Sequence, residues 1–173
     1  MRRGMVQVYT GTGKGKTTAA IGLACRAIGR GLKVYMIQFL KGGWETGELK
    51  AIEERENFKI VQYGRKEFVD PSNPSKEDMD LAKKALDHAR EVLKSGEWDM
   101  VILDELNVAI NMGLVPLEEA LQLIKEKPEE VELVITGRGA PKEIIEVADL
   151  VTEMREVKHY YRKGIPARKG IEY

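Results

Sequence analysis

Residues 9–18 read YTGTGKGKTT, directly after an apolar run and directly before a helical pattern. The glycines Gly11, Gly13 and Gly15 leave the backbone free to point several N–H groups at one anion. A helix that starts at the end of such a loop adds the positive end of its dipole. The order strand, loop, helix therefore favours a phosphate-binding loop over a glycine-rich turn with unrelated lysines.

Two side chains at the end of the loop supply further phosphate chemistry. Lys16 provides a point charge for phosphate oxygens, and the Thr17 hydroxyl is a ligand for Mg²⁺. One position departs from the usual motif, G-x-x-x-x-G-K-[ST], because Thr10 stands where the first glycine belongs. The stretch is therefore not a standard NTPase loop, and we expect the phosphates to sit differently in it.

The composition sets the class of the protein. The chain has 173 residues, 43% of them hydrophobic and 32% charged, which suits one globular domain over 1–173. Its 28 basic and 28 acidic residues give no basic excess, so we expect no nucleic-acid partner. Cys25 is the single cysteine, which excludes an intrachain disulfide. With no apolar stretch near the length of a membrane span and no signal peptide, the expected location is the cytoplasm.

Apolar runs alternate with helical patterns along the whole chain. We expect strands at 5–10, 33–40, 58–63, 99–105, 131–137 and 150–154, and helices at 17–30, 75–93, 116–126 and 141–148. Such alternation predicts a mainly parallel sheet covered on both faces. The first helix is apolar nearly all round, so we expect it to be buried with Cys25 in the core.

The helix that begins near residue 75 has its own start signal. Ser75 and Asp78 form a pattern like a capping box. One face then carries the apolar side chains Met79, Ala82, Ala85, Leu86, Ala89 and Leu93. We expect His88 on the surface of this helix, and we expect neither His88 nor the tail residue His159 to be catalytic.

Polar clusters follow several of the predicted strands, and in parallel sheets ligands bind at the carboxyl ends of strands. The run VILDE ends in Asp104 and Glu105. Carboxylate oxygens suit Mg²⁺, so this pair predicts a metal site; the alternative is a helix N-cap. Arg138, in TGRG, is either a phosphate ligand or part of a plain turn. Lys41 and Trp44, in QFLKGGWETGE, either border the site or lie in a structural loop.

Taken together, the motifs closely resemble a known family. YTGTGKGKTTAA, QFLKGGWETGE, VILDELN, VITGRGAP, ADLVTEM and VKHYYRKGIPARKGIEY occur in that order over nearly the whole chain. They are similar to the cob(I)alamin adenosyltransferases that have a P-loop, RecA-like fold. The resemblance implies a three-layer α/β fold with a mainly parallel central sheet. A threonine in place of the first glycine is itself a mark of that family.

The resemblance also implies a reaction. A corrinoid with cobalt reduced to Co(I) attacks the 5′-carbon of ATP, forming an adenosylcorrinoid and releasing triphosphate. In that family the nucleotide lies across the loop in the reverse sense, so the loop clamps a leaving triphosphate. The implied ATP contacts are Gly11, Thr12, Gly13, Lys14, Gly15, Lys16, Thr17 and Thr18, with Lys41 and Arg138 as further candidates. The implied Mg²⁺ neighbours are Thr17, Glu105 and Asp104, and the implied catalytic residues are Lys16 and Glu105.

The corrinoid side of the site departs from the family pattern. Phe68 falls where the family has a phenylalanine that contacts the corrinoid, and Trp44 is a second candidate contact. Asp70 stands where the family has a tryptophan, so that aromatic side chain is absent from this sequence. A flavodoxin-like reductant and a homodimer are family expectations. The alternatives are a P-loop NTPase or kinase acting at the γ-phosphate, and a non-enzymatic nucleotide or corrinoid binder.

Overall fold

The computed structural model of the chain describes residues 3–43 and 45–173. Within these residues, parallel strands form a six-stranded central sheet in the order β3-β2-β4-β5-β1-β6. The strands are β1 (Val6–Thr10), β2 (Val34–Phe39), β3 (Phe58–Tyr63), β4 (Met100–Asp104), β5 (Glu132–Thr136) and β6 (Leu150–Glu153). All six lie within the ranges expected from the sequence.

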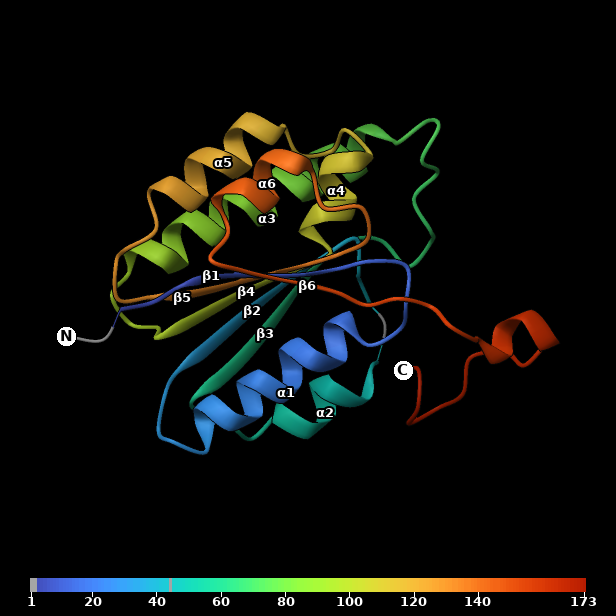
Figure 1. Ribbon diagram of the computed structural model, residues 1–173, viewed down its shortest axis with the longest axis horizontal. Helices are drawn as coiled ribbons and strands as arrows, with labels where there is room; N and C mark the ends of the chain where they lie inside the picture. Colours follow the sequence, from blue (N-terminus) through green and yellow to red (C-terminus); the bar gives the residue numbers. More distant parts are fainter. Residues whose placement is uncertain (1–2, 44) are drawn as a thin grey trace.

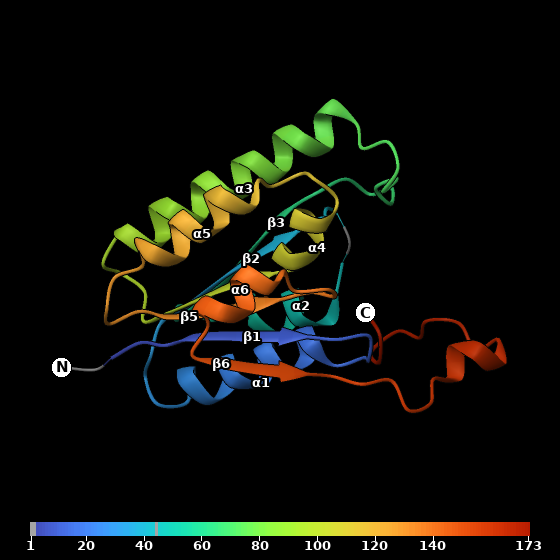
Figure 2. The same cartoon turned by 45° about the horizontal axis from the view of Figure 1, so that its top comes forward.

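Helices cover both faces of the sheet, so the molecule has three layers (Figures 1 and 2). One face carries α1 (Lys16–Ile28) and α2 (Gly47–Ile52). The other face carries α3 (Lys76–Lys94), α4 (Leu106–Asn111), α5 (Leu117–Lys125) and α6 (Lys142–Val147). The α/β fold with a parallel central sheet is confirmed. The short helices α2 and α4 were not predicted, whereas the equally short α6 was.

The two layers of helices enclose two groups of buried apolar side chains. The group beneath α3 to α6 includes Phe39, Leu86, Leu103, Leu123 and Ile135. The group beneath α1 includes Ala20, Ala24, Met36, Phe58 and Ile102. The central strands β2, β4 and β5 are buried on both faces, which explains their continuous apolar runs.

Three side chains on the helices differ in exposure from what the apolar patterns suggest. Cys25 is exposed, because α1 packs through a narrow line of alanines at positions 20, 24 and 27 and leaves its outer face in solvent. Met79 is 50% exposed, because the first turn of α3 extends past the sheet (Figure 2). His88 is half-buried, with Tyr35 Oη 3.1 Å from Nε2 and Tyr63 Oη 2.8 Å from Nδ1.

The predicted capping box at the start of α3 is confirmed. Ser75 Oγ accepts a hydrogen bond from the Asp78 amide at 3.1 Å, and the Asp78 carboxylate accepts one from the Ser75 amide at 2.9 Å. The buried face of the helix then runs through Ala82, Ala85, Leu86, Ala89 and Leu93, as expected.

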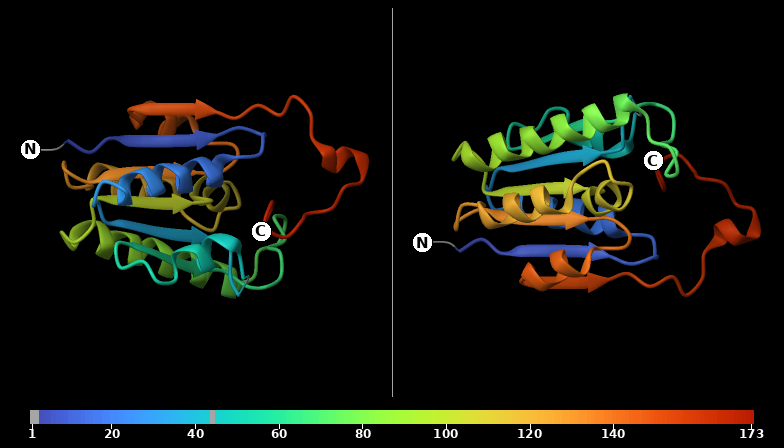
Figure 3. Two further views of the ribbon diagram at one scale, coloured as in Figure 1. Left: turned by 90° about the horizontal axis from the view of Figure 1, so that it is seen from below. Right: turned by 90° about the horizontal axis from the view of Figure 1, so that it is seen from above.

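The strands all point their carboxyl ends to the same edge of the sheet (Figure 3). The N-terminus lies at the opposite edge, and the segment after β6 runs out beyond the carboxyl ends and folds back. This segment contains a short 3-10 helix, η1 (Tyr160–Lys163). The loops after β1, β2, β4 and β5 therefore meet at one edge, together with the end of the chain. In the described part of the chain, no helix is long and apolar enough to cross a bilayer.

Candidate active site

The loop between β1 and α1 depends on glycine for two separate reasons. Gly11 and Gly15 have φ values of 96° and 115°, in the left-handed region that side chains disfavour. Gly13 donates a backbone hydrogen bond to the Met154 carbonyl at 2.6 Å. A Cβ atom added at Gly11 or Gly13 would lie 2.4 Å or 2.8 Å from that same carbonyl oxygen. The loop is therefore shaped by its torsions and also pressed against the chain that follows β6.

Lys16 lies inside the curve of this loop. Lys16 is only 7% exposed, and its Nζ donates a hydrogen bond to the Gly13 carbonyl at 2.6 Å. Burial lowers the pKa of Lys16, and the nearby Arg138 charge lowers it further. An anion that enters the loop would interact strongly with this ammonium group, because the two charges would meet away from bulk water.

Asp104, at the end of β4, joins the loop to the neighbouring strands. It is fully buried, and its Oδ1 accepts from Thr17 Oγ1 at 2.8 Å and from Thr136 Oγ1 at 2.7 Å. Its Oδ2 accepts from Lys41 Nζ at 2.8 Å and from Gln38 Nε2 at 3.1 Å. Burial lowers the pKa of Lys41, but the Asp104 carboxylate together with the Glu105 and Glu48 charges outweighs burial, and the net direction is upward. The expected neighbours Thr17, Lys41 and Asp104 are thus in direct contact.

Glu105 follows in an unusual backbone conformation. Its φ of 65° is left-handed, which turns the chain sharply from β4 into α4. Its side chain occupies the N-cap position of α4 but makes no capping hydrogen bond. Burial raises the pKa of Glu105, the Asp104 charge raises it further, and Lys41, Lys16 and Arg138 oppose that rise. The result is a desolvated carboxylate among cationic groups, without a hydrogen-bond donor among the described side chains.

The loop after β5 carries Arg138 and is held by its backbone. Asn111 Nδ2 donates to the Gly139 carbonyl at 2.8 Å and to the Arg138 carbonyl at 3.2 Å. Asn107 Nδ2 donates to the Gly137 carbonyl at 3.2 Å. The Arg138 side chain itself is exposed on the wall of the pocket.

Sequence reasoning missed both of these asparagines. Asn107 and Asn111 are four residues apart on α4, and that spacing places them on one face of the helix. This spacing indicates a shared helix face only once α4 is known to be a helix, and α4 was not predicted from the sequence.

A pocket of about 440 Å³ opens over the loop. Its walls include residues 14–18, Lys41, Glu105 and Arg138, which brings most of the expected ATP contacts together. Gly47 and Glu48 of α2 and the last four residues of the chain complete the walls. Phe68 is not part of this pocket; it is 91% exposed on the loop between β3 and α3. The other expected corrinoid contact, Trp44, lies outside the described residues.

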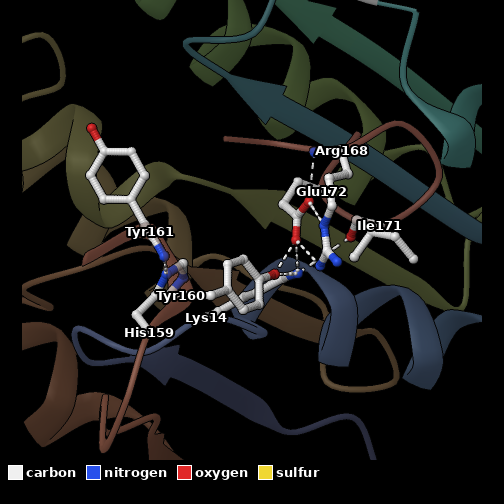
Figure 4. Close-up of polar contacts among 7 residues, drawn as sticks. All are labelled: Lys14, His159, Tyr160, Tyr161, Arg168, Ile171 and Glu172. Atoms are coloured by element: carbon white, nitrogen blue, oxygen red, sulfur yellow. Dashed lines mark hydrogen bonds and ion pairs between the residues drawn. The ribbon is translucent and has the colours of Figure 1, made fainter. Parts of the chain in front are cut away.

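Lys14 contacts the end of the chain rather than the rest of its own loop. Its Nζ donates to Glu172 Oε1 at 2.8 Å and to Tyr160 Oη at 2.9 Å (Figure 4). Nothing in the sequence pointed to this contact, because the partners are 146 and 158 residues away from Lys14.

A strand, a glycine-rich loop and a helix that begins with a buried lysine form the centre of this site. The threonine after the lysine is bonded to Asp104 at the end of β4, a parallel strand separated from β1 by β5. This arrangement defines a nucleotide-binding protein of the P-loop class.

Comparisons with known proteins give the family. The model of the ATP:corrinoid adenosyltransferase family BtuR/CobO/CobP matches residues 2–173. A corrinoid adenosyltransferase of Escherichia coli K12 is 41% identical over 172 residues, which cover 99% of this chain and 86% of that protein. The corrinoid adenosyltransferase CobA of Salmonella typhimurium is 38% identical over the same shares of the two chains. A corrinoid adenosyltransferase of Pseudomonas aeruginosa is 38% identical over 99% of this chain and 84% of its own.

The chain belongs to the ATP:corrinoid adenosyltransferase family. The resemblance seen in the motifs is thereby confirmed, and the protein is an enzyme of that kind. Neither the γ-phosphate transferase nor the non-enzymatic binder is favoured.

Proposed function

We propose that the pocket over residues 11–18 is where this enzyme transfers the 5′-deoxyadenosyl group of ATP to a corrinoid. The electron pair of Co(I) forms the Co–C bond, the bond between C5′ and its oxygen breaks, and that electron pair leaves with triphosphate. One observation carries the assignment: Thr17 at the end of the loop is bonded to Asp104 at 2.8 Å, in the pocket that Lys16 and Glu105 also line.

The residues present suit a reaction in which negative charge grows on the leaving group. Lys16, the loop amides and Arg138 surround the place where a triphosphate would lie. Such pre-set positive groups stabilise the leaving group without reorganising during the reaction. Reduced cobalt is itself the nucleophile, so no base is needed.

Thr17 and Glu105 would hold Mg²⁺, with Asp104 next to Thr17, and the bound ion would neutralise phosphate charge. Hydroxyl and carboxylate oxygens are the ligands that Mg²⁺ prefers. Both oxygens of Asp104 already accept two hydrogen bonds each, so Asp104 orients Thr17 and contributes charge. The Glu105 carboxylate accepts no hydrogen bond from the described side chains. Because it is also desolvated, a cation would stabilise it more than it would stabilise Asp104.

For the corrinoid we propose the loop between β3 and α3, with Phe68 and Trp44 as contacts. Gly42 and Gly64 bring this loop against the loop after β2, since a Cβ atom at Gly42 would lie 1.8 Å from the Gly64 carbonyl oxygen. Lys66, two residues before Phe68, lies against Gly43 in the loop of Lys41, since a Cβ atom at Gly43 would lie 2.8 Å from Lys66 Cε. Asp70, in the family's tryptophan position, is used within its own turn, where it accepts from the Ser72 amide at 2.9 Å.

The family resemblance supports further expectations about partners. We propose that a flavodoxin-like protein reduces the cobalt, that the enzyme works as a homodimer and that it acts in the cytoplasm. We also propose that residues 1–173 work as one domain.

The assignment is tested by mixing the protein with Mg-ATP and chemically reduced cobalamin. The expected products are a light-sensitive Co–C compound, followed in the visible spectrum, and inorganic triphosphate, identified by ³¹P NMR. Appearance of ADP or phosphate in place of triphosphate would contradict the proposal. Lys16→Ala protein should keep its circular dichroism spectrum, because among the described residues the Lys16 ammonium bonds to the Gly13 carbonyl of its own loop. It should lose ATP binding and transfer, and an unchanged rate would refute the role given to the loop.

A further inference from the structure

The last residues of the chain form part of the nucleotide pocket. Gly170, Ile171, Glu172 and Tyr173 line it opposite the phosphate loop. No residue from 155 to 173 is buried, so the segment has no apolar core of its own to fix its position. Its place over the pocket must come from a small number of polar contacts.

Lys14 makes those contacts in the described chain. Its Nζ donates to Glu172 Oε1 at 2.8 Å, to Tyr160 Oη at 2.9 Å and more weakly to the Ile171 carbonyl at 3.4 Å (Figure 4). These bonds join two separate stretches of the tail to one lysine of the phosphate loop. In the described chain, this one ammonium group thus fastens both stretches of the tail to the phosphate loop.

Glu172 is the centre of the cluster (Figure 4). Its Oε2 accepts from the Arg168 amide at 2.7 Å, and the Arg168 guanidinium lies 3.3 Å from both of its oxygens. Tyr160 Oη donates to Glu172 Oε1, and Arg168 stacks over the Tyr160 ring at 4.7 Å. The glutamate thus has donors on both oxygens and a fixed geometry.

The charges of this cluster favour closure over a bound triphosphate. Lys14 and Arg168 are positive and Glu172 is negative, so the closed cluster keeps one net positive charge next to the phosphates. A lysine that is already ordered loses less conformational freedom when the ligand arrives. A covered pocket also strengthens every charge interaction inside it, because water is excluded.

We propose that Glu172 is a positioning residue of the nucleotide site, which holds Lys14 at the pocket wall and thereby fastens residues 170–173 over the phosphates. This inference rests on the proposed function of the pocket. It predicts that the charge of Glu172 affects the affinity for ATP and leaves the chemical step alone, since Glu172 acts through Lys14.

The test compares Glu172→Gln and Tyr160→Phe with two matched variants in the same tail. Glu156→Gln breaks an ion pair inside the tail, where Glu156 Oε1 lies 2.6 Å from Arg162 Nε. Tyr161→Phe alters a neighbouring tyrosine whose ring is turned away from the cluster (Figure 4). We expect Glu172→Gln and Tyr160→Phe to raise the KM for ATP roughly threefold to tenfold, with kcat changed by less than about twofold. Glu156→Gln and Tyr161→Phe should behave as the unaltered enzyme does.

A second readout does not depend on turnover. Trypsin cleavage after Arg162, Lys163 and Arg168, followed by mass spectrometry, should slow when Mg-ATP alone is added to the unaltered protein. The Glu172→Gln protein should lose that protection, and the Glu156→Gln protein should keep it. Equal KM values and equal protection in these two variants would overturn the proposal, as would a lower kcat at unchanged KM.

Lys16→Ala separates this inference from the proposed function. If Lys16→Ala binds ATP as well as the unaltered protein does, the nucleotide lies elsewhere and both proposals fall. If Lys16→Ala loses ATP binding while Glu172→Gln retains full affinity and protection, the pocket is correctly assigned and only the role of Glu172 is refuted.

Discussion

The side-chain hydroxyl of Thr10 accepts a hydrogen bond from the backbone amide of Ala140 at 3.0 Å. This bond joins the end of β1 to the loop that carries Arg138. The Thr10 carbonyl also accepts from the Met154 amide at 2.8 Å, so the residue lies between two segments that border the phosphate loop. Thr10 is the position at which the chain departs from the usual motif. Its hydroxyl makes a hydrogen bond here that the glycine of the usual motif could not make.

Replacing Thr10 by valine should measure how much this hydroxyl contributes to stability and to ATP binding, since valine has nearly the same shape as threonine but no hydroxyl. The Ala140 amide would lose its partner, and we expect the free energy of unfolding to fall by about 1 kcal/mol. The KM for ATP should rise as the Arg138 loop loses an anchor. Urea denaturation and ATP titration measure the two effects. Thr10→Ser keeps the hydroxyl and serves as the control; equal behaviour of the two variants would contradict the anchoring role.

Gly13 and Gly22 offer a matched pair of glycine substitutions. A Cβ atom at Gly13 would lie 2.8 Å from the Met154 carbonyl oxygen, whereas one at Gly22 in α1 would meet nothing within 4 Å. We expect Gly13→Ala to displace the loop, to cost about 1–3 kcal/mol of stability and to weaken ATP binding at least about tenfold. Gly22→Ala should instead stabilise the helix by about 0.5–1 kcal/mol. Thermal denaturation and ATP binding report both outcomes, and a loop that tolerates Gly13→Ala would refute the packing argument.

Glu105→Gln tests the proposed metal neighbour. The substitution removes the charge of a desolvated carboxylate that has no hydrogen-bond donor among the described side chains, so the Mg²⁺ concentration for half-maximal activity should rise about tenfold. Electron paramagnetic resonance with Mn²⁺ and ATP gives a direct count of bound metal. The exposed Glu118 on α5 provides a control, since Glu118→Gln changes the same charge far from the pocket. An unchanged Mg²⁺ requirement would remove Glu105 from the metal site.

The parts of the fold that were predicted correctly depend on local sequence. Continuous apolar runs mark the buried strands, and the spacing of glycine, lysine and threonine marks the loop before α1. The Ser75–Asp78 capping box is likewise a pattern of four residues, and the structure confirms it. Each of these features is set by neighbours in the chain, so each is visible without a three-dimensional model.

The parts that were missed depend on contacts between distant segments. Asn111 acts on carbonyls 27 and 28 residues away, and Lys14 pairs with Glu172 from the opposite end of the chain. The exposure of Cys25 follows from how closely the alanines of α1 approach the sheet. The left-handed turn at Glu105 is a conformation that residue type alone does not predict.

Arg65 and Asp78 give a prediction about stability and pH. Arg65 Nε donates to Asp78 Oδ1 at 2.8 Å and Arg65 Nη2 donates to Asp78 Oδ2 at 3.0 Å, which ties the loop of Phe68 to the start of α3. The Arg65 guanidinium, with a smaller contribution from the hydroxyl and amide of Ser75, outweighs burial and lowers the pKa of Asp78 from 3.8 to about 2. Because the folded pKa is the lower one, the stabilisation is complete above about pH 4 and is lost as the pH falls towards about 2.

We therefore expect this pair to contribute roughly 1–2 kcal/mol at neutral pH, allowing for the partial exposure of Arg65. Arg65→Gln should lower the free energy of urea unfolding at pH 7 by about that amount and have little effect near pH 2. Arg90→Gln is the control, since Arg90 pairs with Asp87 and Glu119 on more exposed positions. Its effect should be smaller at pH 7, because exposed ion pairs are screened by solvent. A constant difference between Arg65→Gln and the unaltered protein from pH 7 to pH 2 would show that the ionised Asp78 is not what Arg65 stabilises.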